Sequence, residues 1–107
     1  MLNITKLAIW PELQAMGFER VNFRFWGKLN TIGARLGTPK GEILIEPCYG
    51  TGEKKYHITG PVKSPKQDTI YQYDSIGRKQ EIYILRDRIN QFYTAREIRA
   101  IIKYMTD

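Results

Sequence analysis

The 107-residue sequence has little of the chemistry that metal centres, disulfides and membrane spans require. It contains one cysteine, Cys48, and one histidine, His57, so neither an intramolecular disulfide nor a Cys/His metal site can form. No apolar run approaches the length of a membrane-spanning helix. The first residues lack the basic-then-apolar pattern of a signal peptide, which predicts a cytoplasmic protein without membrane contact.

Nucleotide-binding motifs are also absent. Gly50-Thr51-Gly52 lacks the spacing of a Walker loop, and none of the glycine patterns follows a strand and opens a long helix. We therefore expect no metal and no cofactor. What remains is an ordinary globular composition, 42% hydrophobic and 26% charged, which predicts a single domain over residues 1–107.

The strongest local pattern predicts a C-terminal helix. Thr94 and Glu97 have the spacing of a capping box, and Tyr93 and Ile98 are placed as its hydrophobic staple. Apolar residues then recur at helical spacing, which predicts one buried stripe. The stripe comprises Ile98, Ile101, Ile102 and Met105. A short N-terminal helix is predicted around Pro11, which suits a first helical position, and it should end at Gly17.

Strands are predicted between these helices. Alternating patterns and segments rich in β-branched and aromatic residues lie at 19–29, 30–36, 42–46, 54–59, 70–73 and 81–85. Residues 74–77 predict a hairpin turn between the last two strands. Residues 60–67, with two prolines and two lysines, predict an exposed connection. The apolar content of 81–85 on both faces predicts a central, covered strand.

The fold prediction is therefore α+β. An antiparallel sheet of five or six strands should carry the short N-terminal helix and should pack the C-terminal amphipathic helix on one face. A strongly bent sheet or partial barrel is the alternative.

Charge favours an anionic or acidic partner. The net charge is +6, of which residues 1–53 carry +1 and residues 54–107 carry +5. On the first strand, Arg20, Arg24 and Trp26 alternate with apolar residues, so we expect them on one face, extended by Lys28. Arginine suits phosphate and tryptophan suits base stacking. An amphipathic outer face is the alternative interpretation. The full set of candidate contact residues is Arg20, Arg24, Trp26, Lys28, Lys54, Lys55, Lys63, Lys66, Arg86 and Arg88.

These residues predict a small basic non-catalytic protein that binds nucleic acid or a nucleoprotein complex. The alternative is a phage- or plasmid-type inhibitor that binds the acidic surface of a protein or nucleoprotein enzyme, because Tyr, Trp and Arg also anchor protein interfaces. Exposed edge strands are compatible with a homodimer.

A second alternative is a toxin-like, metal-independent ribonuclease. His57 would act as general base or acid, with partners from neighbouring strands, and cations would stabilise the transition state. The candidate partners are Tyr56, Glu81, Tyr83, Arg86 and Arg88.

Overall fold

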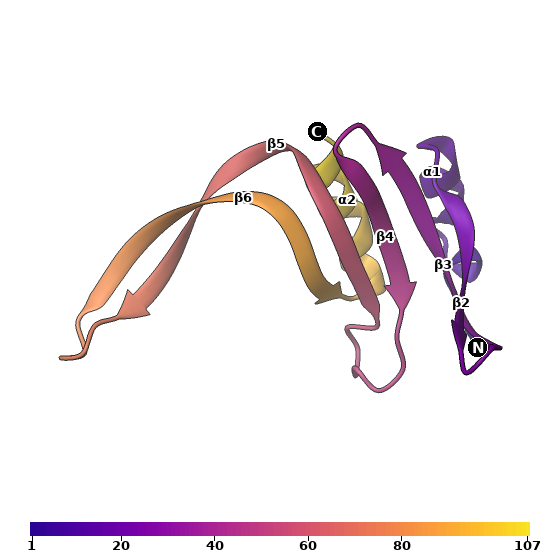
Figure 1. Cartoon of the computed structure of the whole chain (residues 1–107), viewed down its shortest axis with the longest axis horizontal. Coiled ribbons are helices and arrows are strands. Elements are labelled where there is room, and N and C mark those ends of the chain that lie inside the picture. The colour runs from indigo at the N-terminus through magenta and orange to yellow at the C-terminus, as the bar shows by residue number, and fades with distance from the viewer.

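The computed structural model describes all 107 residues and shows a six-stranded, mostly antiparallel sheet with both helices on one face (Figure 1). The elements are β1 (Leu2–Asn3), a 3₁₀ turn (Ile4–Lys6), α1 (Trp10–Ala15), β2 (Glu19–Phe25), β3 (Lys28–Thr38), β4 (Gly41–Pro47), β5 (Tyr56–Tyr73), β6 (Lys79–Tyr93), a second 3₁₀ turn (Ala95–Glu97) and α2 (Ile98–Thr106). The α+β prediction is confirmed. The sheet is open, so the partial barrel is not formed.

Strand pairing follows a meander around β3. The order is β1-β3-β4-β5-β6, and β2 pairs with β3 as well. β1 is the one parallel partner, with Leu2 opposite Thr31, and the sequence did not indicate this two-residue strand. Gly33 lies where β3 passes close to β4, and a Cβ there would collide with the carbonyl of Ile45. A glycine inside a strand often marks such a close approach between backbones.

The core lies between the sheet and the two helices. It gathers residues from almost every element, including Leu13 of α1, Ile45 of β4, Ile58 of β5 and Ile102 of α2. The predicted helical stripe is confirmed, because Ile98, Ile102 and Met105 are buried and Ile101 is partly buried against the core. No helix is long and apolar enough to cross a membrane.

Both helices have the start and stop signals that the sequence predicted. The backbone N–H of Thr94 donates to the Glu97 carboxylate at 2.9 Å, which forms the predicted capping box. Pro11 lies in the first turn of α1. Gly17 follows that helix with a φ of +105°, in the left-handed region that glycine adopts at a helix end.

The long hairpin of β5 and β6 differs most from the predicted strand pattern. Residues 60–67 are part of the continuous strand β5, so the predicted exposed connection is wrong. β4 pairs with β5 only as far as Thr59. Beyond that point one edge of β5 is free, and a free edge accommodates proline. Gly60, at a φ of +147°, and a bulge between Pro61 and Lys66 mark the place where the hairpin leaves the body of the sheet.

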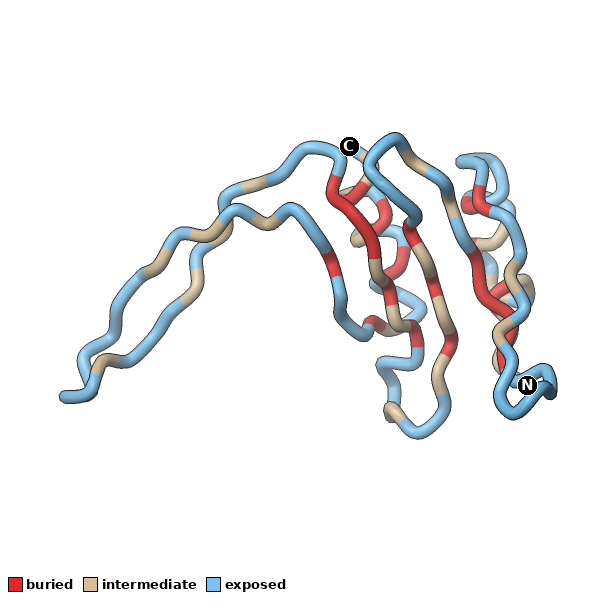
Figure 2. The backbone as a smooth tube through the Cα atoms, in the orientation of Figure 1, coloured by how far each residue is buried: buried red, intermediate tan, exposed pale blue.

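Beyond the bulge the hairpin projects as a two-stranded ribbon (Figures 1 and 2). We call this segment the arm; it comprises Lys66–Tyr73, the turn Asp74–Arg78 and Lys79–Arg86. The predicted turn is confirmed: Asp74 accepts hydrogen bonds from the N–H groups of Ile76 and Arg78, and Gly77 has a φ of +84°. The prediction that 81–85 is central and covered is wrong, because β6 is an edge strand and this part of it lies on the arm.

Candidate functional site

The structure divides the ten predicted contact residues among different parts of the molecule. Five lie at the end of the sheet that carries the N-terminus, where the β2–β3 turn and the β4–β5 loop are found (Figure 1). These five are Arg24, Trp26, Lys28, Lys54 and Lys55. Arg20 lies further along β2 and donates to Asn22 at 3.3 Å. The remaining four, Lys63, Lys66, Arg86 and Arg88, lie around the base of the arm.

Trp26 occupies the turn between β2 and β3 rather than the face of the strand. Phe25 pairs with Lys28, so Trp26 and Gly27 form a two-residue hairpin loop. Both have positive φ, +53° and +75°, as a type I′ turn requires. The register shifts by one residue between Phe23 and Arg24, and the extra residue, Asn30, lies on β3. The prediction that Trp26 shares a strand face with Arg20 and Arg24 is wrong because β2 ends at Phe25, whereas Arg20 and Arg24 lie at alternate positions of β2.

The turn presents two large aromatic rings to solvent. The Trp26 side chain is 87% exposed and the Phe25 side chain 65%. Their rings meet edge to face with centroids 5.9 Å apart, an arrangement that aromatic pairs favour. Such exposure of a tryptophan in a turn is uncommon, since burial of the ring would stabilise the fold. The pair is therefore placed to contact another molecule.

The β4–β5 loop reaches the same end of the sheet through Tyr49. The Tyr49 hydroxyl accepts a hydrogen bond from the Leu2 N–H at 2.8 Å. Leu2 pairs with β3, and β3 also pairs with β2 on its other edge. Lys54 and Lys55 are exposed on this loop. Burial raises the pKa of the Cys48 thiol at the start of the loop, so the thiol is protonated at neutral pH.

The cations at this end form no ion pair, although Lys54 lies near enough to Glu97 to help lower the pKa of that carboxyl group. The five ion pairs of the structure lie elsewhere: Arg35–Glu19, Arg35–Glu42, Arg78–Asp74, Arg86–Asp68 and Arg99–Glu12. We call the set Arg24, Phe25, Trp26, Lys28, Tyr49, Lys54 and Lys55 the basic rim. It combines four unpaired cations with three exposed aromatic rings. This combination is typical of surfaces that hold a nucleic-acid backbone and its bases.

The predicted residues around the base of the arm are largely engaged within the molecule. The Lys66 ammonium donates to the carbonyl of Tyr104 at 3.1 Å and lies 4.5 Å from the centre of the Tyr104 ring. Arg86 pairs with Asp68 at 3.1 Å. These groups line a shallow groove of about 600 Å³ between the arm and α2, whose walls mix cations with the carboxylates of Asp68 and Glu97. Mixed charges of this kind do not favour a polyanion.

Lys63 and Arg88 lie nearby on the two strands of the hairpin. The Lys63 carbonyl accepts from the Lys40 ammonium at 2.7 Å, while the Lys63 side chain is exposed. Arg88 is exposed opposite Pro61 and has no ion pair. These two cations lie outside the basic rim.

The residues of the ribonuclease hypothesis do not come together around His57. The His57 ring stacks on Phe92 with centroids 4.6 Å apart, and its Nε2 lies 2.6 Å from the amide oxygen of Asn90. Glu81 and Tyr83 lie on the arm, where they pair with Tyr71 and Thr69 rather than with the strand region of His57. Tyr56 is buried in the core, and burial raises the pKa of its hydroxyl. The histidine therefore has stacking and amide partners.

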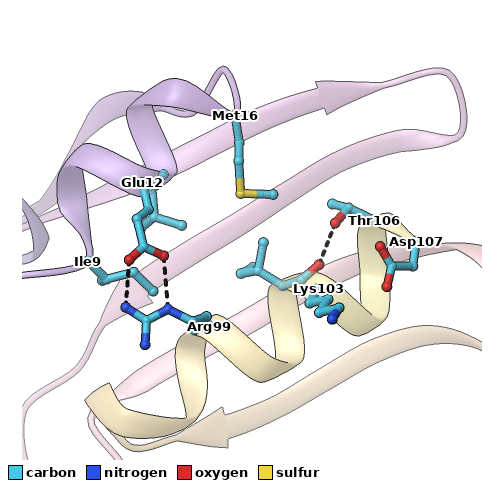
Figure 3. Close-up of a pocket in the computed structure, with 9 residues that line it drawn as sticks. Ile9, Glu12, Met16, Arg99, Lys103, Thr106 and Asp107 are labelled. Atoms are coloured by element: carbon cyan, nitrogen blue, oxygen red, sulfur yellow. Dashed lines mark hydrogen bonds and ion pairs between the residues drawn. The ribbon is translucent and has the colours of Figure 1, made fainter.

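A small cavity of about 220 Å³ between α1 and α2 is bordered by an ion pair (Figure 3). The Arg99 guanidinium donates twice to the Glu12 carboxylate, at 2.6 and 2.9 Å. These hydrogen bonds lower the pKa of Glu12 and raise that of Arg99. The pair connects the two helices, so it is a structural link rather than a free binding group.

Sequence reasoning missed Phe25 and Tyr49 as members of the exposed surface. Phe25 is one of the apolar residues that alternate with the arginines of β2, and the two-residue turn that follows it brings it to the end of the sheet. The glycine at position 27 was the available signal for that turn. No family model, no curated protein and no solved structure matches this chain.

Proposed function

We propose that this protein is a non-catalytic binding protein that contacts nucleic acid, free or within a nucleoprotein complex, through the basic rim. The observation that carries the proposal is the strongly exposed Trp26 in a turn whose flanking strands carry Arg24 and Lys28, two cations without an ion pair. Stacking of bases on an aromatic ring and neutralisation of phosphates are the two contributions that such binding combines.

The backbone at Trp26 supports a role for the ring. Non-glycine residues at positive φ are uncommon, and asparagine is the residue best suited to this position of a type I′ turn. Tryptophan occupies it with a φ of +53° and most of its surface in water. Neither the turn geometry nor core packing requires an indole ring at position 26, whereas stacking on a nucleic-acid base would use it.

Charge outside the arm supports a polyanionic partner. The arm holds four Lys/Arg and three Asp/Glu, a net charge of +1, so the rest of the chain carries +5. A basic body attracts polyanions and accelerates their association. An acidic protein surface offers the same charge, but it offers no unpaired bases for Trp26 to stack on.

Binding to labelled single- and double-stranded DNA and RNA, over a series of salt concentrations, tests the proposal. Trp26→Asn removes the ring and retains a residue suited to the turn, so the fold should be preserved. We expect the variant to bind about 5- to 150-fold more weakly, the range for loss of one stacking residue. Arg24→Gln combined with Lys28→Gln should reduce the slope of log affinity against log salt by about two.

Lys103→Gln is the control for loss of a cation away from the rim, because Lys103 is exposed on α2 and α2 ends at the opposite end of the sheet (Figure 1). It should bind as the unmodified protein does. Intact substrate on a gel would agree with binding without cleavage. Equal binding by Trp26→Asn and the unmodified protein, with folding verified by circular dichroism, would contradict the proposal. So would a complete lack of binding at low salt.

A further inference from the structure

The arm exposes more apolar surface than a two-stranded ribbon normally leaves in water. Cross-strand pairing places Tyr71 and Tyr73 on the same side as Tyr83 and Leu85. We call this surface the tyrosine side of the arm; it comprises Gln67, Thr69, Tyr71, Tyr73, Lys79, Glu81, Tyr83 and Leu85. The other side carries Lys66 and Asp68, which line the groove next to α2. Gln67, at the base of the arm, also lines that groove, whereas the tyrosine side from Thr69 outward has no residue in it.

The rings on the tyrosine side are largely uncovered. Tyr73 is 72% exposed, Leu85 66% and Tyr83 62%. Three tyrosines at such exposure present roughly 400 Å² of ring surface, and the leucine adds to it. A contiguous apolar patch of this size usually marks an interaction site. A two-stranded hairpin is also marginally stable alone, so a covering partner would stabilise the arm.

The charges of the arm are nearly balanced and mostly paired. Arg86 bonds Asp68 at 3.1 Å, and Arg78 bonds Asp74 at 2.9 Å. One cation and one anion remain on the tyrosine side: Lys79, whose ammonium lies 4.1 Å from the centre of the Tyr71 ring, and Glu81. A surface with one charge of each sign does not attract a polyanion, but it complements a copy of itself.

We propose that the tyrosine side of the arm is a homodimer interface, in which the arms of two copies pack face to face about a two-fold axis. In a two-fold contact each residue meets the partner's counterpart in both directions. With the two-fold axis near Gln80, Lys79 of each copy lies against the partner's Glu81, Tyr71 and Tyr73 lie beside the axis, and Leu85 lies at the edge of the contact. This inference is independent of nucleic-acid binding at the basic rim.

Size and charge favour a second copy as the occupant. A stable interface needs about 800 Å² from each partner, and the tyrosine rings supply roughly half of this. Leu85 and the polar residues of the same side supply the remainder. The molecule is 50 Å long, and the arm projects from a body of charge +5. Contact through the arms keeps the two basic bodies apart, so their repulsion opposes dimer formation little.

Sedimentation equilibrium of the purified protein, from low micromolar to about 100 μM, tests the proposal, because dimer formation depends on concentration. We expect a dimer of the unmodified chain. Tyr73→Glu should raise the dimer dissociation constant about 30-fold or more, as loss of a central interface residue does. Phe25→Glu is the matched control, because Phe25 is 65% exposed on the basic rim, and it should leave the dimer unchanged.

Reversing the charge of Lys79 or of Glu81 provides a second test, which leaves the apolar residues of the proposed interface unchanged. Lys79→Glu and Glu81→Lys should each weaken the homodimer at least about tenfold, because like charges then face each other. An equimolar mixture of the two variants should recover association as a heterodimer, since both pairs are again complementary. Two-fold symmetry makes this outcome specific to the proposed contact.

Three results would overturn the proposal. The first is a monomer at every concentration, including one that instead binds a different protein through the arm. The second is a dimer that Tyr73→Glu leaves intact. The third is a mixture of the charge variants that associates no better than either variant alone. Nucleic-acid binding by the same preparations is measured separately, so failure at the rim and failure at the arm remain distinguishable.

Discussion

At Gly33 the absence of a side chain allows two strands to approach. An added Cβ would collide with the Ile45 carbonyl, come within 2.6 Å of the Phe23 ring and come within 3.1 Å of Pro47. The neighbouring backbone is tied by strand pairing to both β2 and β4, so it has little freedom to move. A glycine in a strand interior often marks such a contact, and here the structure identifies the atoms involved.

Gly33→Ala should lower the free energy of unfolding by about 1–3 kcal/mol or more, the range for overpacking of a well-packed site. Chemical denaturation measures the change. Gly37→Ala on the same strand is the control, because an added Cβ there meets nothing within 4 Å and φ is not positive. It should be neutral or slightly stabilising. Equal losses for the two variants would show that β3 is weakened generally and that the close approach is unimportant.

At the scale of one element, α2 begins through a charged hydrogen bond. The hydrogen bond from the Thr94 backbone N–H to the Glu97 carboxylate is the main cause that lowers the pKa of Glu97. Because the folded state favours the ionised form, this bond contributes stability at neutral pH. The contribution is present above the ordinary pKa of glutamate and is lost as the pH falls through the lowered value. Glu12 and Asp74 contribute stability with the same pH dependence, because their pKa values are also lowered.

Glu97→Gln should therefore reduce the decrease in the free energy of unfolding that occurs as the pH falls. At neutral pH the variant should be less stable than the unmodified protein, because the charge-assisted bond becomes a neutral one. In strong acid the two should converge, because Glu97 is then protonated in both states. Denaturation curves from neutral to acidic pH measure this convergence.

The same substitution at Glu53, which is exposed and has no ion pair, is the control and should leave the curve unchanged. A constant difference between Glu97→Gln and the unmodified protein at every pH would mean that the carboxylate charge is not involved.

For the whole molecule, the arm and the body are built on different principles. All fifteen residues of the hydrophobic core lie outside Lys66–Arg86. The arm contacts the body through Lys66 and Tyr104, and otherwise extends into solvent (Figure 2). The body is thus a self-sufficient two-layer packing of sheet and helices, whereas the arm depends on hairpin hydrogen bonds and on any surface that covers it.

Replacing Lys66–Arg86 by Asn-Gly should leave a body that still unfolds cooperatively. The free energy of unfolding should fall by less than about 2 kcal/mol, the upper range for loss of a cation–π contact such as that of Lys66 and Tyr104. Thermal and denaturant unfolding measure this. The shortened chain should retain binding at the basic rim and should be monomeric. A chain that fails to fold would show that the arm is needed to form the sheet.

Local sequence patterns determined the ends of the helices, the buried stripe of α2, the turn at Asp74–Gly77 and the α+β class. These features depend on residues a few positions apart, so their chemistry is visible in the sequence. Only the tertiary structure decided that β5 continues through Gly60–Gln67, that the hairpin leaves the sheet as an arm, and that the β2–β3 turn and the β4–β5 loop lie at the same end of the sheet (Figure 1). Those features depend on hydrogen bonds between distant strands and on where each pairing stops, and composition does not record either.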